Sequence, residues 1–118
     1  MARYVDGFLL AVPKKKLPAY RAMAAKAGKV WREHGALEFV ECVIDEVPKS
    51  FGVPFPKAAK TKAGEVVVFS WIAYKSRAHR NAVNKKVMAD PRLQQAAGEM
   101  PFDHTRMSWG GFRTLVDL

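Results

Sequence analysis

The sequence predicts an α+β protein of the ferredoxin-like class, in which a four-stranded antiparallel sheet carries both helices on one face. The order of apolar periodicities along the 118 residues reads βαββαβ, which is the order of that fold. Hydrophobic residues make up 49% of the chain, which excludes a disordered protein. The length suits one hydrophobic core, so we expect a single domain over residues 1–118.

The first half of the chain predicts a strand, a helix and a second strand. Residues 3–12 carry aromatic, β-branched and aliphatic side chains on both alternating faces. Residues 17–34 place apolar side chains at helical spacing, with Pro18 in the first turn and Gly35 after the end as a left-handed stop. Residues 36–45 alternate again, as a strand does.

The second half repeats the pattern after a long connection. Residues 46–63 contain three prolines, so we expect a loop without helix or central strand. Residues 65–74 give the strongest strand signal of the chain, and Ser76 is a candidate N-cap for a helix that runs to Ala89.

The last thirty residues predict shorter elements. A helical turn is expected over residues 93–97, followed by a loop over residues 98–103. Residues 106–116 predict the fourth strand, which we expect to be interrupted by a bulge or bend at Gly110 and Gly111.

One face of the predicted sheet lacks a cover. The strands over residues 3–12 and 65–74 are apolar on both faces, while both helices lie on one side of the sheet. An exposed apolar sheet face of this size requires a partner. We therefore expect a homodimer in which two sheets pack face to face as a dimeric α+β barrel with a hydrophobic interface.

The charge balance limits the partners of the chain. The 20 Lys and Arg residues exceed the 11 Asp and Glu residues, which gives a net charge of +9 spread over both halves. We expect Lys14, Lys15 and Lys16 to form a solvated turn. No apolar run approaches the ~20 residues of a membrane helix. With a single cysteine, the sequence predicts a cytoplasmic protein without a membrane partner.

Several short segments together resemble one protein family. They are Tyr4-Val5-Asp6-Gly7-Phe8, residues 20–24 and 26–31, His34-Gly35-Ala36-Leu37-Glu38, residues 68–72 and 74–80, Val87-Met88-Ala89-Asp90-Pro91-Arg92, residues 100–103 and Gly110-Gly111-Phe112. On these residues the chain resembles the DUF1428 family of small bacterial proteins, which has no established activity. The resemblance implies a dimeric α+β barrel and no particular reaction. Residues 47–56 depart most from the pattern.

Side chains that could carry chemistry are few. His34, His79 and His104 lack metal-ligand spacing, and no phosphate loop, dinucleotide fingerprint or nucleophile elbow is present, so no metal or cofactor is expected. Asp6 and Glu41 lie on otherwise apolar strand faces, where a carboxylate must be paired or have a shifted pKa. Cys42 is expected to be a buried, inert thiol, and His34 to close the first helix.

The start of the second helix is the predicted position of a ligand. His79 and Arg80 follow its N-cap, where free backbone N–H groups and the helix dipole favour an anionic or enolic molecule. In the competing interpretation, Arg80 pairs with Asp6, Glu41 or Asp103 and His79 caps a carbonyl. The candidate ligand-binding residues are Asp6, Trp31, Ser70, Trp71, His79 and Arg80. No catalytic residue is assigned.

Two functions follow from these features. The first is binding of a small apolar or anionic ligand, with or without a reaction on it; whether the protein is an enzyme stays open. The second is weak, basic association with RNA, since RNA-recognition domains share the βαββαβ order and Phe69 and Trp71 lie on one strand face. The strand over residues 65–74 lacks the basic-Gly-aromatic motif of such domains, so we expect only weak, salt-sensitive RNA binding.

Overall fold

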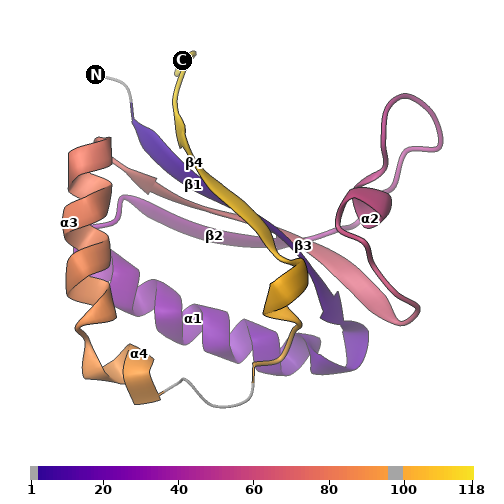
Figure 1. Ribbon diagram of the computed structural model, residues 1–118, viewed down its shortest axis with the longest axis horizontal. Helices are drawn as coiled ribbons and strands as arrows, with labels where there is room; N and C mark the ends of the chain where they lie inside the picture. Colours follow the sequence, from indigo (N-terminus) through magenta and orange to yellow (C-terminus); the bar gives the residue numbers. More distant parts are fainter. Residues whose placement is uncertain (1–2, 96–99) are drawn as a thin grey trace.

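The computed structural model describes residues 3–95 and 100–118 (Figure 1). Its strands are β1 (Tyr4–Pro13), β2 (Glu38–Val43), β3 (Glu65–Tyr74) and β4 (Ser108–Arg113). Its helices are α1 (Leu17–Glu33), α2 (Phe55–Ala58), α3 (Arg77–Met88) and α4 (Pro91–Gln95), with 3-10 turns η1 (Lys14–Lys16) and η2 (His104–Arg106). Within these residues, no helix is long and apolar enough to cross a lipid bilayer.

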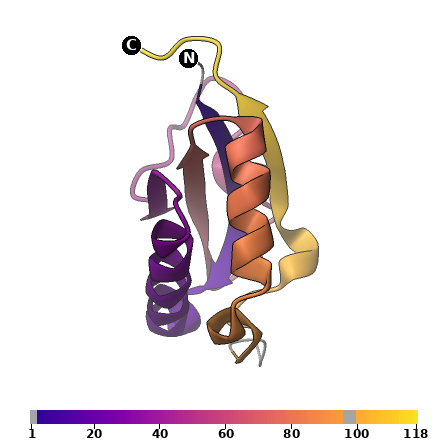
Figure 2. The same cartoon turned by 90° about the vertical axis from the view of Figure 1, so that its left-hand side faces the viewer.

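The strands form one antiparallel sheet in the order β2-β3-β1-β4. Helices α1 and α3 lie side by side on the same side of this sheet, as Figures 1 and 2 show. This arrangement confirms the predicted ferredoxin-like α+β fold. The central pair, β1 and β3, is in register over ten residues, from Tyr4 opposite Tyr74 to Pro13 opposite Glu65.

The helix ends follow the signals in the sequence. Pro18 lies in the first turn of α1, and His34 caps its C-terminus before Gly35, whose φ is 115°. The Ser76 hydroxyl accepts a hydrogen bond from the His79 backbone N–H at 3.1 Å, which confirms Ser76 as the N-cap of α3. His34 also contacts the Asp90 carboxylate, with Nε2 2.9 Å from Oδ2, and so ties the end of α1 to the end of α3.

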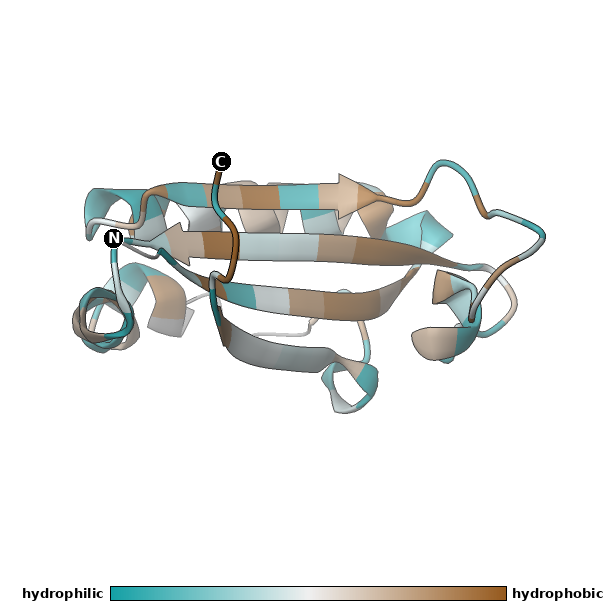
Figure 3. Cartoon of the chain, turned by 90° about the horizontal axis from the view of Figure 1, so that it is seen from above, coloured by the Kyte–Doolittle hydropathy of each residue, from teal (hydrophilic) through white to brown (hydrophobic). Residues whose placement is uncertain are grey.

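Alternation along the strands separates two sheet faces. The face toward α1 and α3 carries both clusters of the core, which include Leu10, Val12, Val68, Ile72 and Tyr74. Side chains at the other strand positions form what we call the open face: Val5, Leu9, Val40, Phe69, Trp71 and Phe112. Figure 3 views the sheet from this side, with the helices behind it. On the open face Phe69 is 45% and Phe112 60% exposed.

Two sequence expectations about loops and strands are wrong. The connection over residues 46–63 contains the short helix α2, which Pro54 initiates with extended backbone angles and which Ala59, 1% exposed, anchors at its C-cap. No bulge interrupts β4, because Gly110 and Gly111 stay in register with Gly7 and Asp6 of β1.

Glycine at position 111 permits close packing and does not produce a bend. A Cβ at this position would collide with the Tyr4 hydroxyl and lie 2.6 Å from Nη2 of Arg80. The side chains of Tyr4 and Arg80 thus occupy the space that any other residue would need.

Two further expectations, the burial of Cys42 and the start of the short helix after α3, differ from the structure. Cys42 is exposed, not buried, because β2 is an edge strand and Cys42 lies opposite Phe69 on the open face. The predicted turn over residues 93–97 is α4, which begins earlier, at Pro91; residues 96–97 and the start of the predicted loop, 98–99, lie outside the described residues.

Gly28 of α1 faces β2 at short range. A Cβ on Gly28 would lie 2.7 Å from Cδ1 of Phe39, so the helix approaches the strand more closely than alanine permits. We expect Gly28→Ala to lower the free energy of unfolding by about 1 kcal/mol, because overpacking outweighs the ~1 kcal/mol gain in helix propensity. Urea denaturation measures the change.

The matched background for this test is Phe39→Leu, which removes the ring. In that background Gly28→Ala is expected to stabilise the protein. An equal effect of Gly28→Ala in both backgrounds contradicts the assignment of the Gly28–Phe39 contact as the cause.

Candidate functional site

A cavity of about 350 Å³ lies between the sheet and the helix layer, and we call it the inner cavity. Strands β1, β2 and β3 contribute its roof, and α1 and α3 contribute its opposite wall. Most of its lining is aromatic or aliphatic and includes Phe8, Leu10, Met23, Trp31, Phe39, Ile72, Phe102, Met107 and Trp109. A largely apolar cavity with a few polar groups is the usual form of a small-molecule site.

One polar cluster of the inner cavity surrounds Asn84 of α3. Its side-chain oxygen Oδ1 accepts hydrogen bonds from Nε1 of Trp31 at 3.1 Å and from the Tyr74 hydroxyl at 3.2 Å. These two bonds fix the indole of α1 and the phenol of β3 against α3. Burial raises the pKa of Tyr74 beyond its ordinary value, so the phenol stays protonated.

Asp6 is the most unusual polar group of the cavity. It is the third residue of β1, is 4% exposed, and has Oδ1 3.4 Å from Nε of Arg80. Among the described residues, neither Oδ1 of Asp6 nor Nε of Arg80 has a hydrogen-bond partner. The carboxylate therefore has a nearby countercharge but unused hydrogen-bonding capacity, which is costly in a buried site.

Burial sets the protonation preference of Asp6. It raises the pKa of the carboxyl above the ordinary value, and the positive charge of Arg80 and the Tyr74 hydroxyl oppose this without cancelling it. Arg80 itself lies over the Tyr4 ring at 4.9 Å and donates from Nη2 to the Tyr4 hydroxyl at 3.1 Å. Those contacts hold the guanidinium beside Asp6.

Glu41 of β2 forms the second acidic group. The Tyr20 hydroxyl of α1 donates to its Oε1 at 2.7 Å. Burial raises the pKa of Glu41, while the hydroxyls of Tyr20 and Ser70 act in the opposite direction. The pKa of Tyr20 is also raised by its burial and by Glu41, so the phenol remains the donor of this bond.

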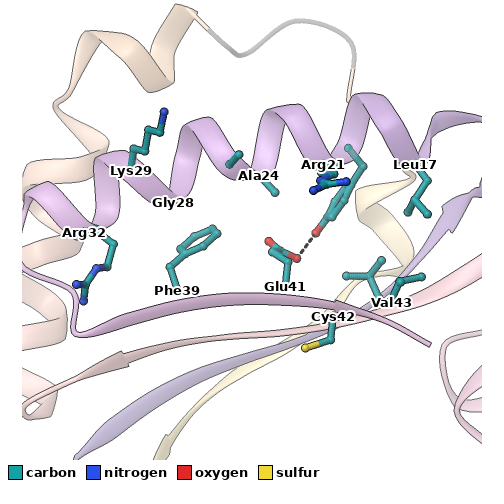
Figure 4. Close-up of a pocket in the computed structure, with 13 residues that line it drawn as sticks. Leu17, Arg21, Ala24, Gly28, Lys29, Arg32, Phe39, Glu41, Cys42 and Val43 are labelled. Atoms are coloured by element: carbon teal, nitrogen blue, oxygen red, sulfur yellow. Dashed lines mark hydrogen bonds between the residues drawn. The ribbon is translucent and has the colours of Figure 1, made fainter. Parts of the chain in front are cut away.

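A second hollow, which we call the outer groove, runs between α1 and β2 and measures about 700 Å³. Figure 4 shows Phe39 and Glu41 pointing from β2 toward α1, with Cys42 turned away. Tyr20, Phe39 and Glu41 line both the outer groove and the inner cavity. The Tyr20–Glu41 hydrogen bond therefore lies at the boundary between the two spaces.

The structure brings together only part of the predicted ligand site. Asp6, Trp31 and Ser70 line the inner cavity. Trp71 also borders it, but its indole packs against Phe69 on the open face, with ring centroids 5.9 Å apart, and its Nε1 donates to Glu38 at 3.1 Å.

His79 and Arg80 are not among the described residues that line the cavity. Nδ1 of His79 accepts from the Lys75 backbone N–H at 2.9 Å, and its ring meets the Tyr74 ring edge to face. Arg80 is paired with Asp6, one of the alternatives that the sequence leaves open. Contact of a ligand with His79 or Arg80 stays a prediction.

Sequence reasoning missed three polar residues of the cavity. Tyr74 shares the face of Ser70 on β3 by simple alternation, so its position was readable from the pattern. Asn84 follows Arg80 by four residues, on the same side of α3. Tyr20 gave no signal as a partner of Glu41, because that contact joins α1 to an edge strand. Across residues 3–95 and 100–118, no three His, Cys, Asp or Glu side chains form a group able to hold a metal ion.

The sheet order and the one-sided helix layer define a ferredoxin-like α+β protein. The chain belongs to the DUF1428 family, described as a protein of unknown function, whose model matches residues 3–104. It is 49% identical over 115 residues to uncharacterized protein YbaA of Escherichia coli K12, covering 98% of both chains. The same identity and coverage hold for YbaA of Shigella flexneri.

Solved structures support the fold. The chain is similar to a dimeric ferredoxin-like protein from an uncultured marine organism, with a TM-score of 0.55, 15% identity, and coverage of 100% of this chain and 98% of that one. At this identity the likeness concerns the fold alone.

The raised pKa of Asp6 predicts that its contribution to stability falls as pH rises. Because the folded protein favours the protonated carboxyl, the contribution of Asp6 to the free energy of unfolding is largest below the ordinary pKa of 3.8 and falls as pH rises through the raised value. The variant Asp6→Asn cannot titrate there. We expect the unfolding free energy of wild type minus that of Asp6→Asn to decrease from acidic to neutral pH, measured by urea denaturation.

Arg80→Gln provides the control, because the Arg80 charge lowers the pKa of Asp6. In the Arg80→Gln background the decrease should be steeper. A difference that rises with pH contradicts the assignment, since it means that Arg80 outweighs burial.

Proposed function

We propose that the protein binds a small, largely apolar molecule in the inner cavity and orients it through a hydrogen-bond donor on that molecule. The observation that carries this concerns Oδ1 of Asp6, in the lining of a cavity with aromatic and aliphatic walls. This atom is buried and lies 3.4 Å from Nε of Arg80, but it has no hydrogen-bond partner among the described residues. A volume of about 350 Å³ falls within the size range of ligand pockets.

The polarity of the lining selects the chemistry of the ligand. The charged side chains among the described lining residues are the carboxylates of Asp6 and Glu41, and Lys and Arg are absent from that set. Such a lining favours a hydroxyl, amide or ring N–H over an anionic group. A ligand that donates to Asp6 would supply the hydrogen bond that Oδ1 lacks.

The same geometry suits a proton transfer. Burial raises the pKa of Asp6, and a carboxyl with a raised pKa is a candidate for proton exchange with a bound ligand donor. Ligand binding is therefore the main proposal for this cavity. Acid–base chemistry on a bound hydroxyl or enol is the second candidate function.

A second copy of the chain fits the open face. The hollow on this face is lined by Val5, Leu9, Phe69, Trp71 and Phe112 without a charged side chain among its described lining residues. RNA binding requires cations near stacked bases, whereas a hydrophobic homodimer interface does not. The dimeric ferredoxin-like structure of similar fold agrees with this assignment.

The ligand proposal is tested with probe pairs that differ in the donor. Phenol is compared with toluene, and indole with indene, by calorimetry on the full-length protein. We expect phenol and indole to bind about tenfold more tightly than the hydrocarbons, which is the effect of one hydrogen bond to a charged group. In Asp6→Asn this preference should shrink.

A cavity-filling variant locates the binding. Ser70 is buried in the lining, so Ser70→Leu should abolish binding of all four probes, while Ser70→Ala retains it. The proposal fails if wild type binds none of the probes, or if Ser70→Leu binds them as well as Ser70→Ala does.

The homodimer is tested by light scattering at micromolar concentration. We expect about twice the chain mass of 13.2 kDa for wild type and one chain mass for Phe112→Glu, which places a charge on the open face. Ala22→Glu adds the same charge on the exposed side of α1 and should remain dimeric. A monomeric wild type refutes the proposal.

A further inference from the structure

The outer groove has an apolar floor. Leu17, Ala24, Gly28, Phe39, Val43 and Val68 line it between α1 and β2 (Figure 4). The groove is twice the volume of the inner cavity, at about 700 Å³ against about 350 Å³. It is therefore large enough for an extended aliphatic or aromatic chain.

The rim of the outer groove is basic. Arg21 and Lys29 of α1 border it, are exposed, and have no ion-pair or hydrogen-bond partner among the described residues. Eight residues separate them, which is about 12 Å along the helix. Arg32 also borders the groove, but it donates to the backbone carbonyls of Ala36 and Leu37 and is already engaged.

The floor of the groove continues toward the inner cavity. Tyr20, Phe39 and Glu41 belong to both linings, and the hydrogen bond from Tyr20 to Glu41 lies where the two linings meet. A chain that extends from the groove into the inner cavity would have to displace this bond. Glu41 is the one acidic residue of the groove lining among the described residues, and the Tyr20 hydroxyl covers its Oε1.

We propose that the ligand is an elongated amphiphile, a hydroxylated aliphatic carboxylate. Its carboxylate lies at the basic rim beside Arg21, with Lys29 adding positive charge further along the rim, and its hydroxyl end reaches Asp6 through the boundary between the groove and the inner cavity. This inference rests on the proposed function, because it assigns Asp6 the same role as acceptor. Each part of such a molecule has a complement among the described residues. The anion lies near exposed cations, the methylene chain lies on the apolar floor, and the hydroxyl donates to a buried oxygen that has an ion pair but no hydrogen bond.

The experiment compares three probes of equal chain length by calorimetry at submicellar concentration: 12-hydroxydodecanoate, dodecanoate and 1-dodecanol. Wild type should bind 12-hydroxydodecanoate most tightly. In the double variant Arg21→Gln/Lys29→Gln, both carboxylates should bind about tenfold more weakly, while dodecanol is unchanged. In Asp6→Asn, 12-hydroxydodecanoate should lose its advantage over dodecanoate.

The matched control is Lys26→Gln/Lys86→Gln, which removes the same net charge from exposed positions that do not line the groove. It should bind all three probes like wild type. Equal weakening in both double variants overturns the inference, because it shows a general charge effect. Carboxylate binding that depends on Arg21 and Lys29 but shows no preference for the hydroxyl also overturns it, since the groove then acts alone.

Failure of this inference is distinct from failure of the proposed function. If phenol and indole bind the inner cavity and Ser70→Leu abolishes that binding, while no C12 probe binds, the amphiphile is refuted and the inner site stands. If the aromatic probes fail as well, both are refuted.

Discussion

The ten-residue pairing of β1 with β3 is the constraint on which the rest of the molecule depends. Because side chains alternate along each strand, this register assigns every residue of the two central strands to either the helix face or the open face. A shift by one residue would turn Leu10 and Tyr74 toward the open face and Leu9 and Ala73 toward the helices. The same register places Asp6 opposite Ile72, inside the core, and thereby creates a buried acid that the remaining structure must accommodate.

The surroundings of Asp6 accommodate that acid incompletely. Arg80 supplies charge, Tyr4 holds Arg80 by a hydrogen bond and by its ring, and the missing side chain at Gly111 provides the space for both. A buried ion pair seldom repays the desolvation of its two charges unless hydrogen bonds complete it. Here Oδ1 and Nε remain without hydrogen-bond partners among the described residues. The proposed ligand would supply the missing hydrogen bond to this carboxyl.

Local patterns predicted most of the fold and only part of the site. Strand alternation, the Ser76 cap and the Gly35 stop act over a few residues, so each is visible in the sequence. The prediction of a bend at Gly110 and Gly111 is wrong, because the glycine at 111 instead leaves room for Tyr4 and Arg80, which are distant in sequence.

The same distinction between local and distant contacts separates the predicted from the missed residues of the candidate site. Asp6 and Ser70 follow from strand alternation, whereas Cys42 was misplaced because the pattern does not tell which strand forms an edge. The Asn84 and Tyr20 contacts depend on how the helices pack, which no periodicity within one segment specifies.

The close packing around Gly111 also bears on how sequences of this fold diverge. Positions 4, 80 and 111 share one volume, because the phenol of Tyr4 and the guanidinium of Arg80 fill the space of a side chain at 111. A larger residue at 111 is tolerated only after one of the other two has shortened, and loss of Arg80 leaves Asp6 without its countercharge. Substitutions at these four positions are therefore epistatic, and lineages that replace Arg80 are expected to replace Asp6 with a neutral residue and to relax the requirement for glycine.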